Sequence, residues 1–179
     1  DVMRVLWVIA SPIGDTARIL FGTEGKYGSG HWIDDTSKSL VNNTNSTNNV
    51  ELAIVTTSNV DSFIKKTTKN VVYYCLNMGK SQVGKRFSLD NSSKVKYVVE
   101  DFQPDIIHIW GSETGIGLLF AESVKDIPIV LCFQGVMTAI AKYPNGGLSR
   151  RQLTGFSILD LIKYPIFNKI NKSYLRQSK

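Results

Sequence analysis

Five short apolar runs recur along the chain, with polar or helix-patterned segments between them. The runs are nearly continuous in branched and aromatic residues, which is typical of strands buried on both faces. They cover Arg4–Ser11, Val50–Thr57, Val71–Leu76, Asp105–Trp110 and Ile127–Phe133. This pattern predicts five strands of one sheet whose two faces are both covered.

Apolar residues at helical spacing lie between these strands. Asp34 and Asp35 stand near the start of one such segment, where the helix dipole favours acids, and Asp90 is placed to cap another. The predicted helices are Trp32–Val41, Val60–Lys69, Asp90–Phe102 and Gly115–Lys125, the last capped by residues 112–114. Alternating strands and helices predict a single Rossmann-like α/β domain with a parallel sheet and helices on both faces.

Two segments interrupt this alternation. Asn42–Asn49 is a polar turn, and Gly14–His31 is a longer segment with five glycines, predicted to be a loop. The long segment follows the first strand. Ligands bind outside the carboxyl ends of strands in open parallel sheets, so this segment is placed where a binding loop is expected.

The region after Leu148 has an apolar stripe at helical spacing, with Pro165 placed to kink or split it. The stripe consists of Leu153, Phe156, Leu159, Ile162, Ile166, Ile170 and Tyr174. Residues 142–179 also carry a net charge of +7, so the rest of the chain is close to neutral. A local basic face favours an anionic partner such as lipid head groups, phosphates or nucleic acid, although a solvated helix face has the same composition.

Composition narrows the class of protein. The 179 residues suit one domain, and a hydrophobic content of 42% supplies a core and excludes wholesale disorder. No apolar run is long enough to cross a bilayer, and we expect no secretion signal at the start. Cys75 and Cys132 lie within strand-like runs, so we expect buried thiols without a disulfide or a metal site.

The glycine-rich segment is the first candidate site. Gly28, Ser29 and Gly30 directly precede a predicted helix, and glycine there lets backbone amides approach a phosphate closely. The G-x-G-x-x-G spacing and a Walker lysine are both absent. A phosphate-binding loop and a flexible loop that uses glycine for its turns therefore both fit.

The second candidate site follows the strand in PDIIHIWGSETG. His108 points to the opposite face from its isoleucine neighbours, and Trp110, Ser112 and Glu113 come at the carboxyl end. Glu113 can accept hydrogen bonds from hydroxyls, and Trp110 can stack on a sugar. Each also has a structural explanation, namely core packing for His108 and Trp110 and first-turn pairing for Glu113.

The third candidate ends the last predicted strand, in CFQGV. Gln134 offers both a donor and an acceptor to a sugar hydroxyl, and Gly135 allows a close backbone approach; a simple strand exit is the alternative. The sequence has no G-x-S-x-G, H-E-x-x-H or C-x-x-C motif and only two histidines. No catalytic residue is assigned.

The order of these motifs resembles the N-terminal half of a glycosyltransferase family 4 enzyme with the GT-B fold. The resemblance rests on RVLWVIASPIG, GKYGSGHW, PDIIHIWGSETG and IPIVLCFQGV, and spans residues 4–136. It implies retaining transfer of a sugar from a nucleotide-sugar to an acceptor hydroxyl of a glycan or lipid-linked glycan, without a cofactor or metal. The family often has a histidine where this chain has Gln134.

The resemblance also implies roles for the candidate residues. Gly28, Ser29 and Gly30 would face the donor diphosphate; Gln134 and Gly135 would lie near the donor sugar. The acceptor would bind at His108, Trp110, Ser112 and Glu113. The family's donor-binding C-terminal domain, with its E-x7-E element, is absent from residues 1–179, so we expect the isolated chain to be inactive.

Bacterial polysaccharide biosynthesis in the cytoplasm is the setting that the resemblance implies. The basic extension from about residue 149 would attach the protein to the inner membrane face through residues 142–179. A non-catalytic α/β ligand-binding module is the alternative function. A nucleic-acid partner ranks last, because no basic and aromatic residues interleave on a strand platform.

Overall fold

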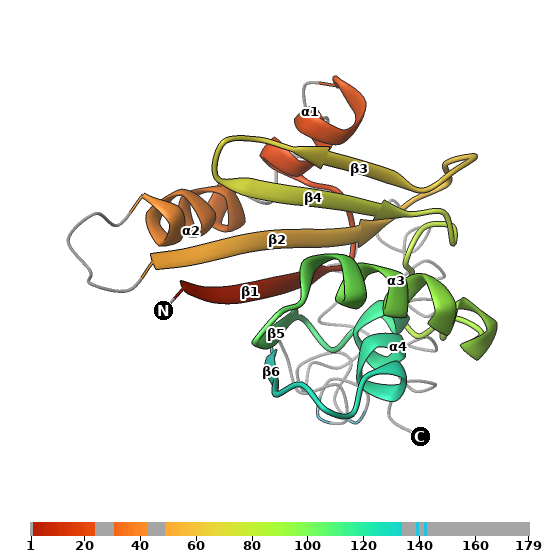
Figure 1. Ribbon diagram of the computed structural model, residues 1–179. Helices are drawn as coiled ribbons and strands as arrows, with labels where there is room; N and C mark the ends of the chain where they lie inside the picture. The colour runs from red at the N-terminus through yellow and green to blue at the C-terminus, as the bar shows by residue number, and fades with distance from the viewer. Residues whose placement is uncertain (1, 24–30, 43–48, 134–138, 140–141, 143–179) are drawn as a thin grey trace, which may run out of the picture.

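One six-stranded sheet forms the centre of the molecule (Figure 1). The computed structural model describes residues 2–23, 31–42, 49–133, 139 and 142. The strands are β1 (Val2–Ile9), β2 (Asn49–Thr57), β3 (Ile64–Thr67), β4 (Val71–Leu76), β5 (Ile106–Trp110) and β6 (Ile129–Cys132). Their order is β3-β4-β2-β1-β5-β6, and every neighbouring pair is parallel except β3 with β4.

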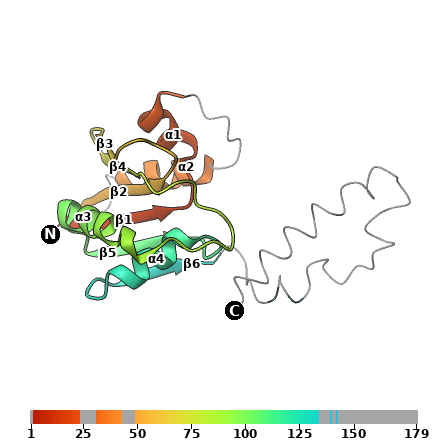
Figure 2. The same cartoon turned by 90° about the vertical axis from the view of Figure 1, so that its right-hand side faces the viewer.

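Helices cover both faces of this sheet (Figures 1 and 2). They are α1 (Gly14–Phe21), α2 (His31–Val41), α3 (Ser92–Phe102) and α4 (Gly115–Ser123), with a 3₁₀ turn at Leu89–Asn91 before α3. Helices α1 and α2 pack on one face, and α3 and α4 pack on the other. The predicted Rossmann-like α/β fold is confirmed.

The central strand β1 is buried on both faces. Leu6 and Val8 point toward the core beneath α3 and α4, while Val5, Trp7 and Ile9 point toward α1 and α2. Side chains alternate across a strand, so a continuous apolar run is needed to fill both cores. This requirement explains why the five sequence-predicted strands all appear in the sheet.

The amino edge of the sheet is closed by a polar network around Arg4. Its backbone N–H donates to the Asp105 carboxylate at 2.7 Å, and its side chain donates to Glu51 at 3.1 Å and to Gln103 at 3.4 Å. The network ties the starts of β1, β2 and β5 together. The carboxyl ends of these strands, at the opposite edge, are not part of this network.

The predicted helix at Val60–Lys69 is wrong. This segment contains β3, whose residues pair antiparallel with Val72–Cys75 of β4. Lys65 reaches Asp101 at 2.6 Å, and Phe63 packs edge-on against Tyr97. Pairing with a strand that is already buried outweighs a weak helical pattern in a β-branched, aromatic segment.

Other boundaries also differ from the predictions. The glycine-rich segment is not entirely a loop, because its first part forms α1, with Ala17 and Leu20 buried against the sheet. Asp90 does not cap α3; it lies within the 3₁₀ turn, which Ser88 caps. Cys75 is a buried free thiol as predicted, whereas Cys132 is only half-buried. The predicted extension from about residue 149 lies outside the described residues.

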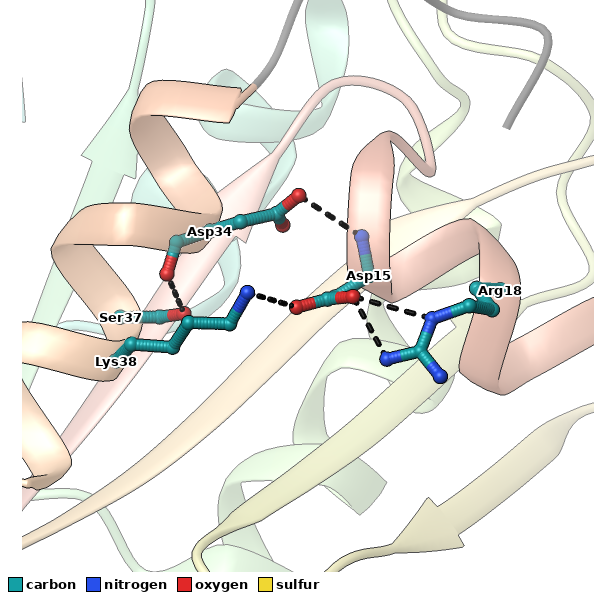
Figure 3. Close-up of polar contacts among 5 residues, drawn as sticks. All are labelled: Asp15, Arg18, Asp34, Ser37 and Lys38. Carbon is teal, nitrogen blue, oxygen red and sulfur yellow. Dashed lines mark hydrogen bonds and ion pairs between the residues drawn. The ribbon is translucent and has the colours of Figure 1, made fainter. Parts of the chain in front are cut away.

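The two helices α1 and α2 are joined by a carboxylate network (Figure 3). The buried Asp34 carboxylate accepts a hydrogen bond from the Asp15 backbone N–H at 3.0 Å and so satisfies a free amide at the start of α1. Lys38 lies 2.8 Å from the Asp15 carboxylate, and Arg18 lies 2.7 Å from it. The hydrogen bond from Lys38 is the main cause that lowers the pKa of Asp15, and the hydrogen bond from Arg18 lowers it further.

Gly14 allows this close approach. Its φ of +50° lies in the left-handed region, and a Cβ there would overlap the Asp34 carboxylate. The chain entering α1 therefore has no space for a side chain at this position. Asp34 and Gly14 together fix where the loop after β1 leaves the sheet.

We expect Gly14→Ala to destabilise the chain more than Gly22→Ala. Gly22 also has a positive φ, of +68°, but a Cβ added to it would have no neighbouring atom within 4 Å. Backbone strain alone should cost about 1 kcal/mol at Gly22, and displacing Asp34 should add about 1–3 kcal/mol at Gly14. Urea unfolding followed by circular dichroism measures both.

The double variant Gly14→Ala, Asp34→Ala isolates the part of the stability loss that comes from the overlap between the new Cβ and the Asp34 carboxylate. Removing the carboxylate relieves the overlap, so the two substitutions together should cost less than the sum of their separate effects. Strict additivity, or equal losses at Gly14 and Gly22, would mean that the close approach does not constrain the fold.

Candidate functional site

The carboxyl ends of β1, β5 and β6 meet at one edge of the sheet. Ile9 is in register with Trp110, and Trp110 is in register with Cys132. Just beyond the strands, the Gly111 N–H donates to the Cys132 carbonyl at 3.0 Å. Side chains that follow these strands therefore start from adjacent positions.

Four aromatic rings gather on the face of this edge that α1 and α2 cover. Trp110 lies 4.1 Å from His108, 5.1 Å from Trp7 and 4.9 Å from Trp32, measured between ring centroids. Trp32 comes from the first turn of α2 and is 44% exposed. Its contact with Trp110 joins the start of α2 to the end of β5.

Partial burial sets the chemistry of this aromatic cluster. Desolvation lowers the His108 pKa below its usual 6.5, so the imidazole is neutral at pH 7. The Trp110 Nε1–H is buried and has no hydrogen-bond acceptor among the described residues. Leaving a buried donor unpaired costs about 1–3 kcal/mol, so a ligand acceptor that reaches this N–H would recover that cost.

A pocket of about 330 Å³ opens on the other face, beside α4. Its wall combines the end of β5, the start of α4 and a segment that follows β4. The lining residues are Gly84, Lys85, Arg86, Ile109, Gly111, Ser112, Thr114, Gly115, Gly117, Leu118, Ala121 and Leu131. They include two cations and no carboxylate.

Backbone contacts hold the basic segment at this pocket. Val83 forms an isolated antiparallel bridge with Thr114, and the Gly84 N–H donates to the Glu113 carbonyl at 3.1 Å. Gly115 lies so close that a Cβ there would overlap the Lys85 carbonyl. The positions of Lys85 and its neighbours are therefore set by the start of α4.

The predicted acceptor residues lie on both faces of the edge. His108 and Trp110 belong to the aromatic cluster, whereas Ser112 lines the pocket, and Glu113 accepts the Gly84 N–H through its carbonyl. His108 and Trp110 thus lie on one face of the edge and Ser112 on the other, and acceptor binding by these residues stays a prediction. The predicted donor residues Gly28, Ser29, Gly30, Gln134 and Gly135 lie outside the described residues.

Lys85 and Arg86 are not among the residues predicted from the sequence. Their only local signal is a glycine followed by two basic residues after β4. The pairing of Val83 with Thr114 brings them to the pocket, and such a long-range contact has no sequence periodicity. Within the described ranges, no three His, Cys, Asp or Glu side chains gather to hold a metal, and no helix is long and apolar enough to cross a bilayer.

Comparison with known proteins finds a distant structural likeness and no sequence match. No protein-family model matches the chain, and no curated protein matches its sequence. Among solved structures, it resembles sucrose-phosphate synthase from Thermosynechococcus elongatus. The TM-score is 0.47 at 10% sequence identity, over 92% of this chain. The chain spans 40% of the length of that synthase.

The half-buried His108 imidazole predicts a pH dependence of stability. Because the folded-state pKa of His108 lies below 6.5, the unfolded chain binds more protons than the folded chain as the pH falls through 6.5. The stabilisation is complete above pH 6.5 and is lost as the pH falls toward the lowered pKa. The free energy of unfolding, measured with urea, should be lower at about pH 5.5 than at about pH 7.5. This difference should be smaller in His108→Gln.

Direct titration provides the second measurement. The imidazole resonances of His108, assigned by comparison with His108→Gln, should titrate below pH 6.5. A midpoint at or above 6.5 would mean that the ring is solvated or paired with an acid, against its desolvated position among the aromatic rings.

Proposed function

We propose that the chain is the acceptor-side Rossmann half of a retaining nucleotide-sugar glycosyltransferase. In such a transfer, the bond between the anomeric carbon and the nucleoside diphosphate breaks, and a bond to an acceptor hydroxyl oxygen forms. The hydroxyl proton leaves with the diphosphate, with overall retention at the anomeric carbon. The reaction needs no redox cofactor, and we expect no metal.

The meeting of motif-flanking residues at one sheet edge is the observation that carries this proposal. Trp32, just after the glycine segment, contacts Trp110 at the end of β5. Cys132, just before the Gln134 segment, accepts the Gly111 N–H. Described residues that flank these segments thus lie beside one another, which supports a cleft between a donor and an acceptor at this edge.

The proposed roles follow this arrangement. Gly28, Ser29 and Gly30 would approach the donor diphosphate, and Gln134 and Gly135 would contact the donor sugar. The acceptor would lie along the edge between the aromatic cluster and the Ser112 pocket. Donors that stabilise the leaving diphosphate would come from a second Rossmann half, which is why no catalytic residue is assigned here.

A non-catalytic ligand-binding module is the second candidate function. One observation favours it: described residues from β5, β6, α4 and the segment after β4 of this one domain line the pocket beside α4. Such a pocket would bind its ligand without a second Rossmann domain.

A transfer assay separates these two functions. The full reading frame that encodes this chain should be incubated with a panel of nucleotide-sugars and glycan acceptors, and product followed by mass spectrometry. We expect glycosylated product from the full reading frame and none from residues 1–179 alone. Calorimetry with the same nucleotide-sugars identifies the donor.

Two results would count against the transferase. The first is a full reading frame that lacks a second Rossmann half with an E-x7-E element and gives no product with any donor. The second is robust turnover by residues 1–179 alone, since that would place the complete catalytic site within this half.

We also propose that residues 142–179 attach the protein to anionic membranes. The proposal rests on their net charge of +7 and on the apolar stripe within them. The chain should sediment with vesicles that contain anionic lipid at low salt, and dissociate as salt is raised. Equal recovery with purely zwitterionic vesicles, or no binding at low salt, would remove this proposal.

A further inference from the structure

We infer that the pocket beside α4 binds a phosphate group, so that the acceptor is a phosphorylated molecule. This inference rests on the proposed function and adds a substrate class to it. The carrying observation is a pocket of about 330 Å³ lined by Lys85, Arg86 and Ser112, with no carboxylate among the lining residues that the structure describes. A sugar phosphate and a phosphate-linked lipid present the same group, and the experiment below separates them.

The two cations give the pocket its charge preference. Both side chains are exposed, and no carboxylate of the described residues forms an ion pair with either. Arginine offers a planar fork of donors that suits phosphate oxygens, and lysine acts as a compact point charge. A neutral hydroxyl ligand would use neither charge, whereas a phosphate would pair with both.

The backbone around these cations is fixed before any ligand binds. The bridge between Val83 and Thr114 and the hydrogen bond from Gly84 to Glu113 hold the chain directly before Lys85. Gly115 lies against the Lys85 carbonyl without space for a side chain. A preformed position of the charges reduces the ordering cost that binding would otherwise carry.

Three aliphatic side chains line another part of the pocket. Ile109 and Leu131 come from β5 and β6, and Leu118 comes from α4. A ligand of matching chemistry has a charged end beside Lys85 and Arg86 and a less polar body against these side chains. The volume lies at the lower end of the range for small-molecule sites, which suits a single sugar ring with its phosphate.

Binding to residues 1–179 tests the inference directly. Glucose 6-phosphate, glucose and farnesyl phosphate are titrated by calorimetry at low salt. The variant Lys85→Ala, Arg86→Ala is compared with Lys66→Ala, Lys69→Ala, which removes the same charge from exposed positions at the distant β3 end of the sheet. Circular dichroism and urea unfolding verify that both variants are folded.

Glucose 6-phosphate or farnesyl phosphate should bind, glucose should not, and the pocket variant should lose at least about tenfold in affinity, as expected for a charge-assisted hydrogen bond. Tighter binding of glucose 6-phosphate identifies a sugar phosphate as the acceptor; tighter binding of farnesyl phosphate identifies a phosphate-linked lipid. Equal loss in the control variant, or equal binding of glucose and glucose 6-phosphate, would overturn the inference.

The outcome is distinguishable from that of the proposed function. Transfer to neutral acceptors, unaffected by the pocket substitutions, would retain the transferase and refute the phosphate pocket. Phosphate binding that depends on Lys85 and Arg86, in a reading frame without transferase activity, would retain the pocket and favour the ligand-binding module.

Discussion

Parallel pairing of a strand buried on both faces is the constraint on which the rest of the structure depends. β1 pairs in parallel with β2 on one side and with β5 on the other, so the carboxyl ends of the three strands lie on the same edge. Both faces must then be covered, and α1 and α2 on one side and α3 and α4 on the other supply that cover. Each loop that follows these strands starts at one edge, which is why Lys85, after β4, lines the same pocket as Ser112, after β5.

The two edges of the sheet differ in how their polar groups are used. At the amino edge, Arg4 is paired with Asp105, Glu51 and Gln103, so its polar groups hold strand ends together. At the carboxyl edge, Lys85 and Arg86 have no carboxylate partner among the described residues. The Arg4 side chain already has partners within the fold, whereas charges held without a carboxylate partner at a pocket are available to a ligand.

The strands could be predicted from the sequence because two-sided burial requires continuous apolar runs, a local property. The His108 orientation follows from the same alternation and agrees with its place among the aromatic rings. β3 could not be predicted in this way because its structure depends on pairing with β4. The start of α1 is capped by Asp34, which comes from another helix. The basic wall of the pocket depends on the contact of Val83 with Thr114. Both features depend on residues far away in the sequence, so no local sequence pattern predicts them.

The central claim is that ligands bind along the carboxyl edge of this sheet. Amide chemical-shift mapping of the isotope-labelled chain, titrated with a uridine diphosphate sugar and with glucose 6-phosphate, tests it most directly. We predict that shifts concentrate at residues 31–33, 84–86 and 110–115 and are absent around Arg4, Glu51 and Gln103. Shifts concentrated at that amino edge, or spread evenly over the sheet, would contradict the claim.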